Sequence, residues 1–294
     1  MAALLAGLCL AAAANDRPAS QPDPDLKRQR EICFPGTSDR LVKTWTGDRI
    51  VLWSDAPIDG QGLLKELAAA GAQLQALLPR ANADSRPSTR PAEEAVALAV
   101  YARAADYRRL WRRVGEHYGG VLPPITTQGY SCRVFCATSF DAPEQFAARR
   151  SVLCHEFAHV WLYRHRGLRN DGNWLTEGLA GAVQLKGHPA SGDRREFARW
   201  LTDGRMLPLK RLMDLDRIEP KDYWQAITLV EHLAATRPQD LPAVVAAFNQ
   251  RRSANAIVTD VLKTDFLSLQ RGWTDHVKRQ GAPPPPSTAP FSPG

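Results

Sequence analysis

The sequence predicts an α+β fold, in which an N-terminal α/β region built on a mixed sheet precedes a mostly helical C-terminal region. Up to residue 142, short apolar runs typical of strands alternate with amphipathic helical stretches. From 143 to 280, apolar residues recur at helical spacing, and only loops at 167–173, 187–192 and 203–208 interrupt the pattern. Strands and helices followed by helices alone favour the α+β class.

The N-terminal half contains six expected elements, four strands and two helices. Residues 41–53 read as two short strands that turn at Gly47-Asp48, which is a hairpin signal. Leucines and alanines at intervals of three and four predict an amphipathic helix over 63–78. The remaining elements are a continuous apolar strand over 95–101, a helix over 104–118 that ends at Gly119-Gly120, and a strand over 129–140.

The two ends of the chain differ from this folded part. Residues 1–14 are small and apolar and end in three alanines, which resembles a secretory signal peptide, although no Lys or Arg precedes the apolar run. Residues 15–39 are polar and are expected to be a linker, and residues 281–294 form a Pro-rich tail expected to be disordered. The predicted domains are therefore an α/β subdomain over 40–142 and a helical subdomain over 143–280, in a secreted or periplasmic protein.

Composition excludes several classes of protein. Of the 294 residues 44% are hydrophobic, which excludes a wholly disordered chain. No stretch approaches the roughly 20 apolar residues that a bilayer span needs, so no transmembrane segment is expected. The net charge of +7 could indicate a nucleic-acid partner. Arginines at 108, 109, 112 and 113 cluster on one predicted helix without an aromatic platform, however, and this favours a solvated helix face and no nucleic acid.

Four cysteines lie outside the first 14 residues, namely Cys33, Cys132, Cys136 and Cys154. In an exported protein an even number permits two disulfides, with three possible connectivities. The spacing of Cys132 and Cys136 could also suggest a metal site, but no second ligand pair is nearby. Disulfides or buried free thiols are therefore the favoured interpretations.

The segment that carries chemistry is His155-Glu156-Phe-Ala-His159. Residues four apart on a helix differ by about 40° around its axis, so both imidazoles face the same way, as two zinc ligands require. Glu156 lies about 100° from His155 and can act as a general base on a water activated by zinc. The alternative is a pair of partly buried histidines beside a surface glutamate.

A third ligand is expected downstream, in Asn173-Trp-Leu-Thr-Glu177-Gly-Leu-Ala180. With this segment, the sequence resembles the gluzincin metallopeptidases of the peptidase MA-like superfamily, in which His-Glu-x-x-His is followed by a glutamate ligand in a W-x-x-E-G-x-A type segment. The resemblance implies one catalytic Zn²⁺ held by His155, His159 and Glu177, with Glu156 as general base.

The resemblance extends beyond the zinc segments. It implies that the strands over 95–101 and 131–140 belong to a sheet whose last strand edges the cleft. Gluzincins also carry a tyrosine that opens a helix, similar to Asp222-Tyr223-Trp224 here, so Tyr223 is expected to stabilise the oxyanion. Tyr223 shares its face with Ile227 and Val230, and packing is the alternative role.

The sequence departs from the family at one point. Some gluzincins place a carboxylate one turn after the third ligand to hold a histidine's second nitrogen, but this position is Gly181 here. Asp171 or a backbone carbonyl is expected instead. Cys154 is expected in the core and not as a fourth ligand.

The expected function is thus a zinc-dependent metallopeptidase that hydrolyses peptide or protein substrates. The alternative is a catalytically weak or inactive zinc domain that acts as a binding module in the cell envelope. No exopeptidase signature is visible, so endopeptidase and aminopeptidase action both stay open, as does the oligomeric state.

Overall fold

The computed structural model describes residues 26–37, 41–79, 95–118, 128–141 and 143–282. The expected signal peptide at 1–14, the Gly119-Gly120 helix end and nearly all of the Pro-rich tail lie outside these ranges. No helix in the described part of the chain combines the length and apolar composition that a membrane span requires.

The N-terminal half is built on a mixed sheet, as predicted, and the sheet has five strands. The strands follow the order β1-β2-β3-β5-β4 across the sheet. Their bounds are Lys43–Gly47 (β1), Ile50–Ser54 (β2), Val96–Tyr101 (β3), Gly129–Ser131 (β4) and Phe135–Ser139 (β5). The central pairs β2–β3 and β3–β5 are parallel, whereas β1 and β4 lie antiparallel at the two edges.

The two hairpins show what local pattern does and does not predict. The expected hairpin over 41–53 is present, and Gly47 pairs with Ile50 around a two-residue turn at Asp48 and Arg49. Both turn residues have positive φ (47° and 62°), as the tight turns of hairpins require. The single strand expected over 129–140 is wrong, because the chain reverses after Ser131 and forms β4 and β5.

Helices cover both faces of the sheet. Leu52, Leu98 and Cys136 point to the face covered by α2 (Gly60–Leu77) and α4 (Pro143–Arg166). The opposite face packs against α1 (Leu26–Cys33) and α3 (Ala104–Tyr118), through side chains such as Tyr101 and Phe135.

Helix α1 corrects the expectation of a linker over 15–39. Ile32 and Cys33 are buried, the Tyr101 hydroxyl donates to the Cys33 carbonyl at 2.6 Å, and Arg113 donates to the carbonyls of both α1 residues. A helix of eight residues is marginal in water by itself, so docking under the sheet stabilises it. A segment this short also shows no clear periodicity in the sequence.

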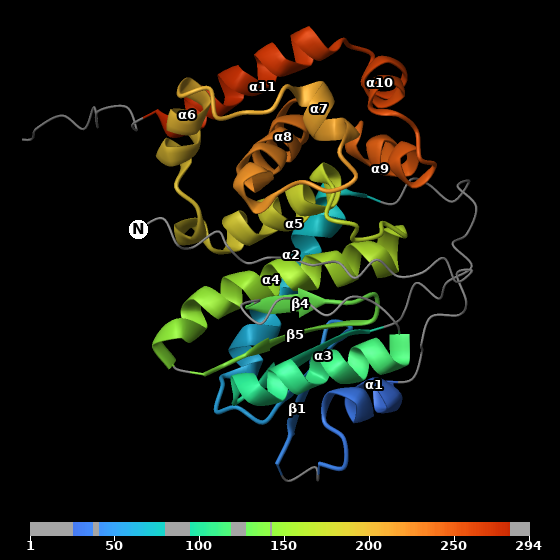
Figure 1. Cartoon of the computed structure of the whole chain (residues 1–294), viewed down its shortest axis with the longest axis vertical. Coiled ribbons are helices and arrows are strands. Elements are labelled where there is room, and N and C mark those ends of the chain that lie inside the picture. The colour runs from blue at the N-terminus through green and yellow to red at the C-terminus, as the bar shows by residue number, and fades with distance from the viewer. Residues whose placement is uncertain (1–25, 38–40, 80–94, 119–127, 142, 283–294) are drawn as a thin grey trace, which may run out of the picture.

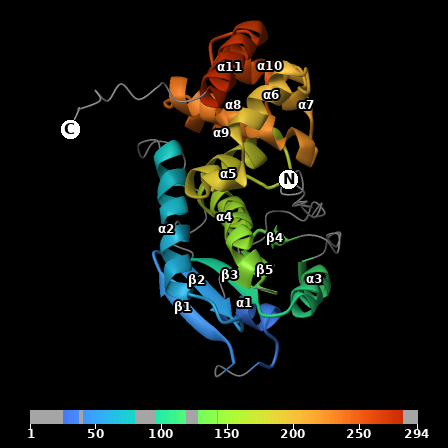
Figure 2. The same ribbon diagram turned by 90° about the vertical axis from the view of Figure 1, so that its left-hand side faces the viewer.

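The C-terminal half is helical, as predicted, and stacks on α4. Figure 1 shows α4 and α5 between the sheet at one end of the molecule and α6, α10 and α11 at the other, and Figure 2 shows the same layering from the side. The helices beyond α4 are α5 (Trp174–Gly187), α6 (Arg194–Thr202), α7 (Leu209–Asp214), α8 (Tyr223–Thr236), α9 (Leu241–Asn249), α10 (Ala254–Ala256) and α11 (Phe266–Gly281). One core cluster runs from Leu98 in the sheet to Trp273 in α11, so the two expected subdomains share a hydrophobic core.

The four cysteines are free thiols, not disulfides. Cys33, Cys136 and Cys154 are buried in the core, and burial raises the pKa of Cys154 to about 12. These residues therefore take the second of the two roles expected from sequence, that of buried apolar side chains.

Candidate metal centre

Helix α4 brings His155, Glu156 and His159 into the middle of the molecule. The apolar neighbours Leu153, Phe157 and Leu162 anchor the helix in the core. The two imidazoles, spaced by four residues, lie on one face with ring centroids 4.7 Å apart and Nε2 atoms 3.0 Å apart. All three polar side chains are at most 5% exposed.

Glu177 reaches the two histidines from the first turn of α5. Asn173 caps this helix, because its Oδ1 accepts from the backbone amides of Leu175 and Thr176 at 3.1 Å each. The capped N-terminus also favours a negative charge nearby. Glu177 is fully buried, so its carboxylate faces the histidines and not solvent.

Two glycines let α5 approach α8 closely. A Cβ at Gly178 would lie 2.6 Å from the carbonyl oxygen of Ala226, and one at Gly181 would lie 2.3 Å from Ile227 Cγ1. A larger side chain at Gly181, a carboxylate included, would collide with the side chain of Ile227.

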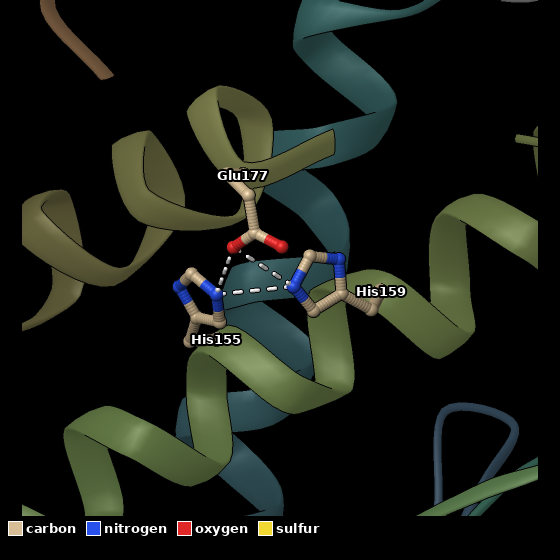
Figure 3. Close-up of side chains that lie close together, drawn as sticks. All are labelled: His155, His159 and Glu177. Atoms are coloured by element: carbon tan, nitrogen blue, oxygen red, sulfur yellow. Dashed lines mark hydrogen bonds and ion pairs between the residues drawn. The ribbon is translucent and has the colours of Figure 1, made fainter. Parts of the chain in front are cut away.

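The predicted ligands converge on one point, as Figure 3 shows. Glu177 Oε2 lies 3.1 Å from His155 Nε2 and 3.5 Å from His159 Nε2. Tetrahedral ligands at about 2.0–2.1 Å from zinc would be separated by about 3.3 Å, so these distances fit such an ion. Glu177 Oε1 is buried and has no hydrogen-bond partner among the described residues, which a bound cation would explain. These three residues are the only group in the described part of the chain that could hold a metal ion.

His155 and Glu177 shift each other's pKa toward the charged form. Burial by itself lowers the pKa of His155, but the hydrogen bond and charge of Glu177 outweigh it and raise this pKa overall. Burial by itself raises the pKa of Glu177, and the charge of His159 and the hydrogen bonds to both histidines lower it to about 2. The carboxylate is therefore ionised, as a metal ligand must be.

Gln184 orients His155, and sequence reasoning missed it. Its Oε1 lies 3.0 Å from His155 Nδ1. An amide oxygen only accepts, so Nδ1 carries a proton, and Nε2 is the nitrogen that would bind a metal ion in place of its hydrogen bond to Glu177. Asp171, one of the two groups expected here, is exposed and lies near Arg169 instead. The spacing in the sequence could have indicated it, because Gln184 follows Glu177 by seven residues, or two helical turns, and so lies on the same face of the helix.

Three further residues differ in their relation to the cluster. The Tyr223 ring lies parallel to the His155 ring, at 6.4 Å between centroids and an interplanar angle of 5°. Tyr223 therefore neighbours one of the predicted ligands, and it is also buried among apolar side chains. Cys154 belongs to the core, as expected, and His232 lies against His276, so neither joins the three predicted ligands.

Comparisons with known proteins add little to this geometry. No family model matches the chain. No curated protein matches it by sequence. Among solved structures, the chain is similar to an M1 zinc metallopeptidase from Deinococcus radiodurans, with 16% sequence identity and a TM-score of 0.43. The match covers 83% of this chain and 53% of the other, so this chain spans about half the length of that protein.

Proposed function

We propose that the protein is a zinc-dependent peptidase of gluzincin type, which hydrolyses peptide bonds in peptide or protein substrates. The observation that carries this proposal is the convergence of two imidazoles and one carboxylate within 3.5 Å, with a second carboxylate, Glu156, next to the first imidazole along the helix. Three protein ligands leave one position of a tetrahedral ion open, which is typical of catalytic and not of structural zinc.

In this proposal each residue has a defined part. Zinc held by His155, His159 and Glu177 would supply a Lewis acid that polarises the scissile carbonyl and activates water at neutral pH. Glu156 accepts a proton from the water as its oxygen bonds to the carbonyl carbon, and returns that proton to the amine as the C–N bond breaks. Tyr223 donates a hydrogen bond from its hydroxyl to the oxygen that becomes negatively charged.

The test combines metal analysis of the purified protein with cleavage of a peptide library. We expect about one zinc per chain and cleavage products in the wild type. Glu156→Gln keeps the size of the side chain but cannot accept the proton, so it should retain zinc and lose turnover by about a hundred-fold or more. A Glu156→Gln protein as active as the wild type would contradict the mechanism. A protein that holds zinc but cleaves no peptide would support the inactive zinc domain instead.

A further inference from the structure

We propose that Ser131 is a positioning residue that holds the carboxylate of Glu156 in place for proton transfer; this role rests on the proposed function. Ser131 is the last residue of β4, the strand at the edge of the sheet beside α4. Its Oγ donates to Glu156 Oε2 at 2.6 Å. Both side chains are buried, at 8% and 2% exposed, so water competes little for this hydrogen bond.

Gly129 brings the strand close enough for this contact. It lies two residues before Ser131, so both residues face α4. A Cβ at Gly129 would lie 2.5 Å from Val152 Cγ1 and 3.1 Å from Glu156 Cγ. The strand backbone therefore packs directly on the helix at Glu156. Gly129 sets the distance between strand and base, and the Ser131 hydroxyl sets the orientation of the carboxylate.

The hairpin that carries Ser131 is held by other contacts. Gly129 and Ser131 pair with Thr138 and Cys136 of β5. The Thr138 hydroxyl donates to the Gln128 carbonyl at 2.6 Å, and Arg149 donates to Ser139 Oγ at 3.0 Å. Removing the Ser131 hydroxyl therefore leaves β4 in place and removes one restraint on the orientation of the Glu156 carboxylate.

A general base acts efficiently only when it is held within reach of the proton that it accepts. With the hydroxyl present, its hydrogen bond to Oε2 favours one orientation of the Glu156 carboxylate. Without it, the fraction of time that the carboxylate spends in that orientation falls. Ser131 bonds to none of the three proposed zinc ligands, so we expect the change in kcat and not in KM or zinc content.

The kinetic test compares Ser131→Ala, Ser131→Thr and Thr138→Val in the zinc-loaded protein. Thr138→Val is the matched control, because it removes a buried hydroxyl from the same hairpin without touching Glu156. We expect Ser131→Ala to lower kcat about tenfold or more at unchanged KM and zinc content, and Ser131→Thr to restore most of kcat. Thr138→Val should leave kcat within about twofold. An unchanged kcat in Ser131→Ala, or an equal loss in Thr138→Val, would overturn the role of Ser131.

A second measurement does not depend on activity. In thermal unfolding of the zinc-loaded protein, Ser131→Ala should lower Tm in the wild-type background but not in a Glu156→Leu background, because the partner of the hydroxyl is then absent. Thr138→Val should lower Tm equally in both backgrounds. Additive shifts for Ser131→Ala would overturn the proposed contact. If the wild type cleaves no peptide, the proposed function itself fails and this role with it, whereas an active wild type with an unaffected Ser131→Ala variant contradicts only the inference about Ser131.

Discussion

Two pairs of histidines lie in the helical half of the protein, and only one of them can hold a metal. His155 and His159 are on α4, with ring centroids 4.7 Å apart, and His232 on α8 faces His276 on α11 at 5.5 Å. All four side chains are at least nine-tenths buried. In the first pair a buried carboxylate, Glu177, faces both rings. Among the residues that the structure describes, no carboxylate completes such a group with the second pair.

Around the second pair, burial and neighbouring positive charges lower the pKa values of the histidines, whereas Glu177 raises that of His155. Burial lowers the pKa of His232 to about 4, and His276, Arg237 and Arg279 add to this effect. Burial, Arg279 and Arg194 lower the pKa of His276 as well. Glu231, which precedes His232 in the sequence, is bound to Arg194 through hydrogen bonds, one of them at 2.7 Å. A carboxylate supplied by a neighbouring helix, and not the proximity of two imidazoles, distinguishes a metal site from a packed pair.

The largest expected effect comes from making the first pair resemble the second. Glu177→Ala removes the carboxylate and leaves two histidines, so zinc affinity should fall by about a thousand-fold. The control is Glu231→Ala, which removes the carboxylate next to the second pair and should leave zinc affinity unchanged. Zinc titration against a competing chelator measures both. Equal affinities in Glu177→Ala and the wild type would mean that Glu177 is not a ligand.

Removal of zinc should affect the stability of the protein next most strongly. An ion that binds only the folded state adds about 2.7 kcal/mol to the free energy of unfolding at a hundred times its dissociation constant. Denaturant unfolding with and without chelator should show this difference in the wild type and lose it in Glu177→Ala. If the chelator has the same effect on both proteins, zinc binds elsewhere.

A glutamine side chain lies next to each histidine pair, and replacing the two glutamines gives a matched comparison with a smaller expected effect. Gln184 lies 3.0 Å from His155 Nδ1, and Gln280 Nε2 lies 3.0 Å from His276 Nε2. Loss of a group that orients a ligating histidine typically weakens metal binding 10–100-fold. We expect this loss for Gln184→Ala and none for Gln280→Ala in the same titration. An effect of the same size in both variants would indicate a general loss of stability.

The smallest expected effect concerns the pH dependence of the second pair. The folded-state pKa of His232 is about 4, below the ordinary value of about 6.5, so the unfolded chain binds more protons between these values. The free energy of unfolding should therefore fall as the pH is lowered through this window, with a contribution of about 1 kcal/mol from His232 at pH 5. Urea unfolding at pH 7 and pH 5 measures it. His232→Gln should show a smaller decrease, and an identical decrease would exclude His232 as its source.

Short-range patterns in the sequence predicted a large part of the fold. The hairpin at 41–53, the helices over 63–78 and 104–118 and the helical half after residue 143 are present, because period and turn chemistry are local properties. The spacing of His155 and His159 placed both imidazoles on one face for the same reason. Helix α1 and the division of 129–140 into β4 and β5 depend on docking against distant segments, and local pattern did not predict them.

The sequence by itself thus determined which residues could bind a metal ion. It also determined that two of them, His155 and His159, lie on the same face of α4. Only the tertiary structure decided their surroundings. Ser131 is 25 residues from Glu156, and Gln184 is 29 residues from His155. The packing of β4 and α5 on α4 brings them together, and Gly129 allows the close approach of β4 to α4. A contact between segments depends on which faces pack together, and the periodicity of a single segment carries no information about its partner.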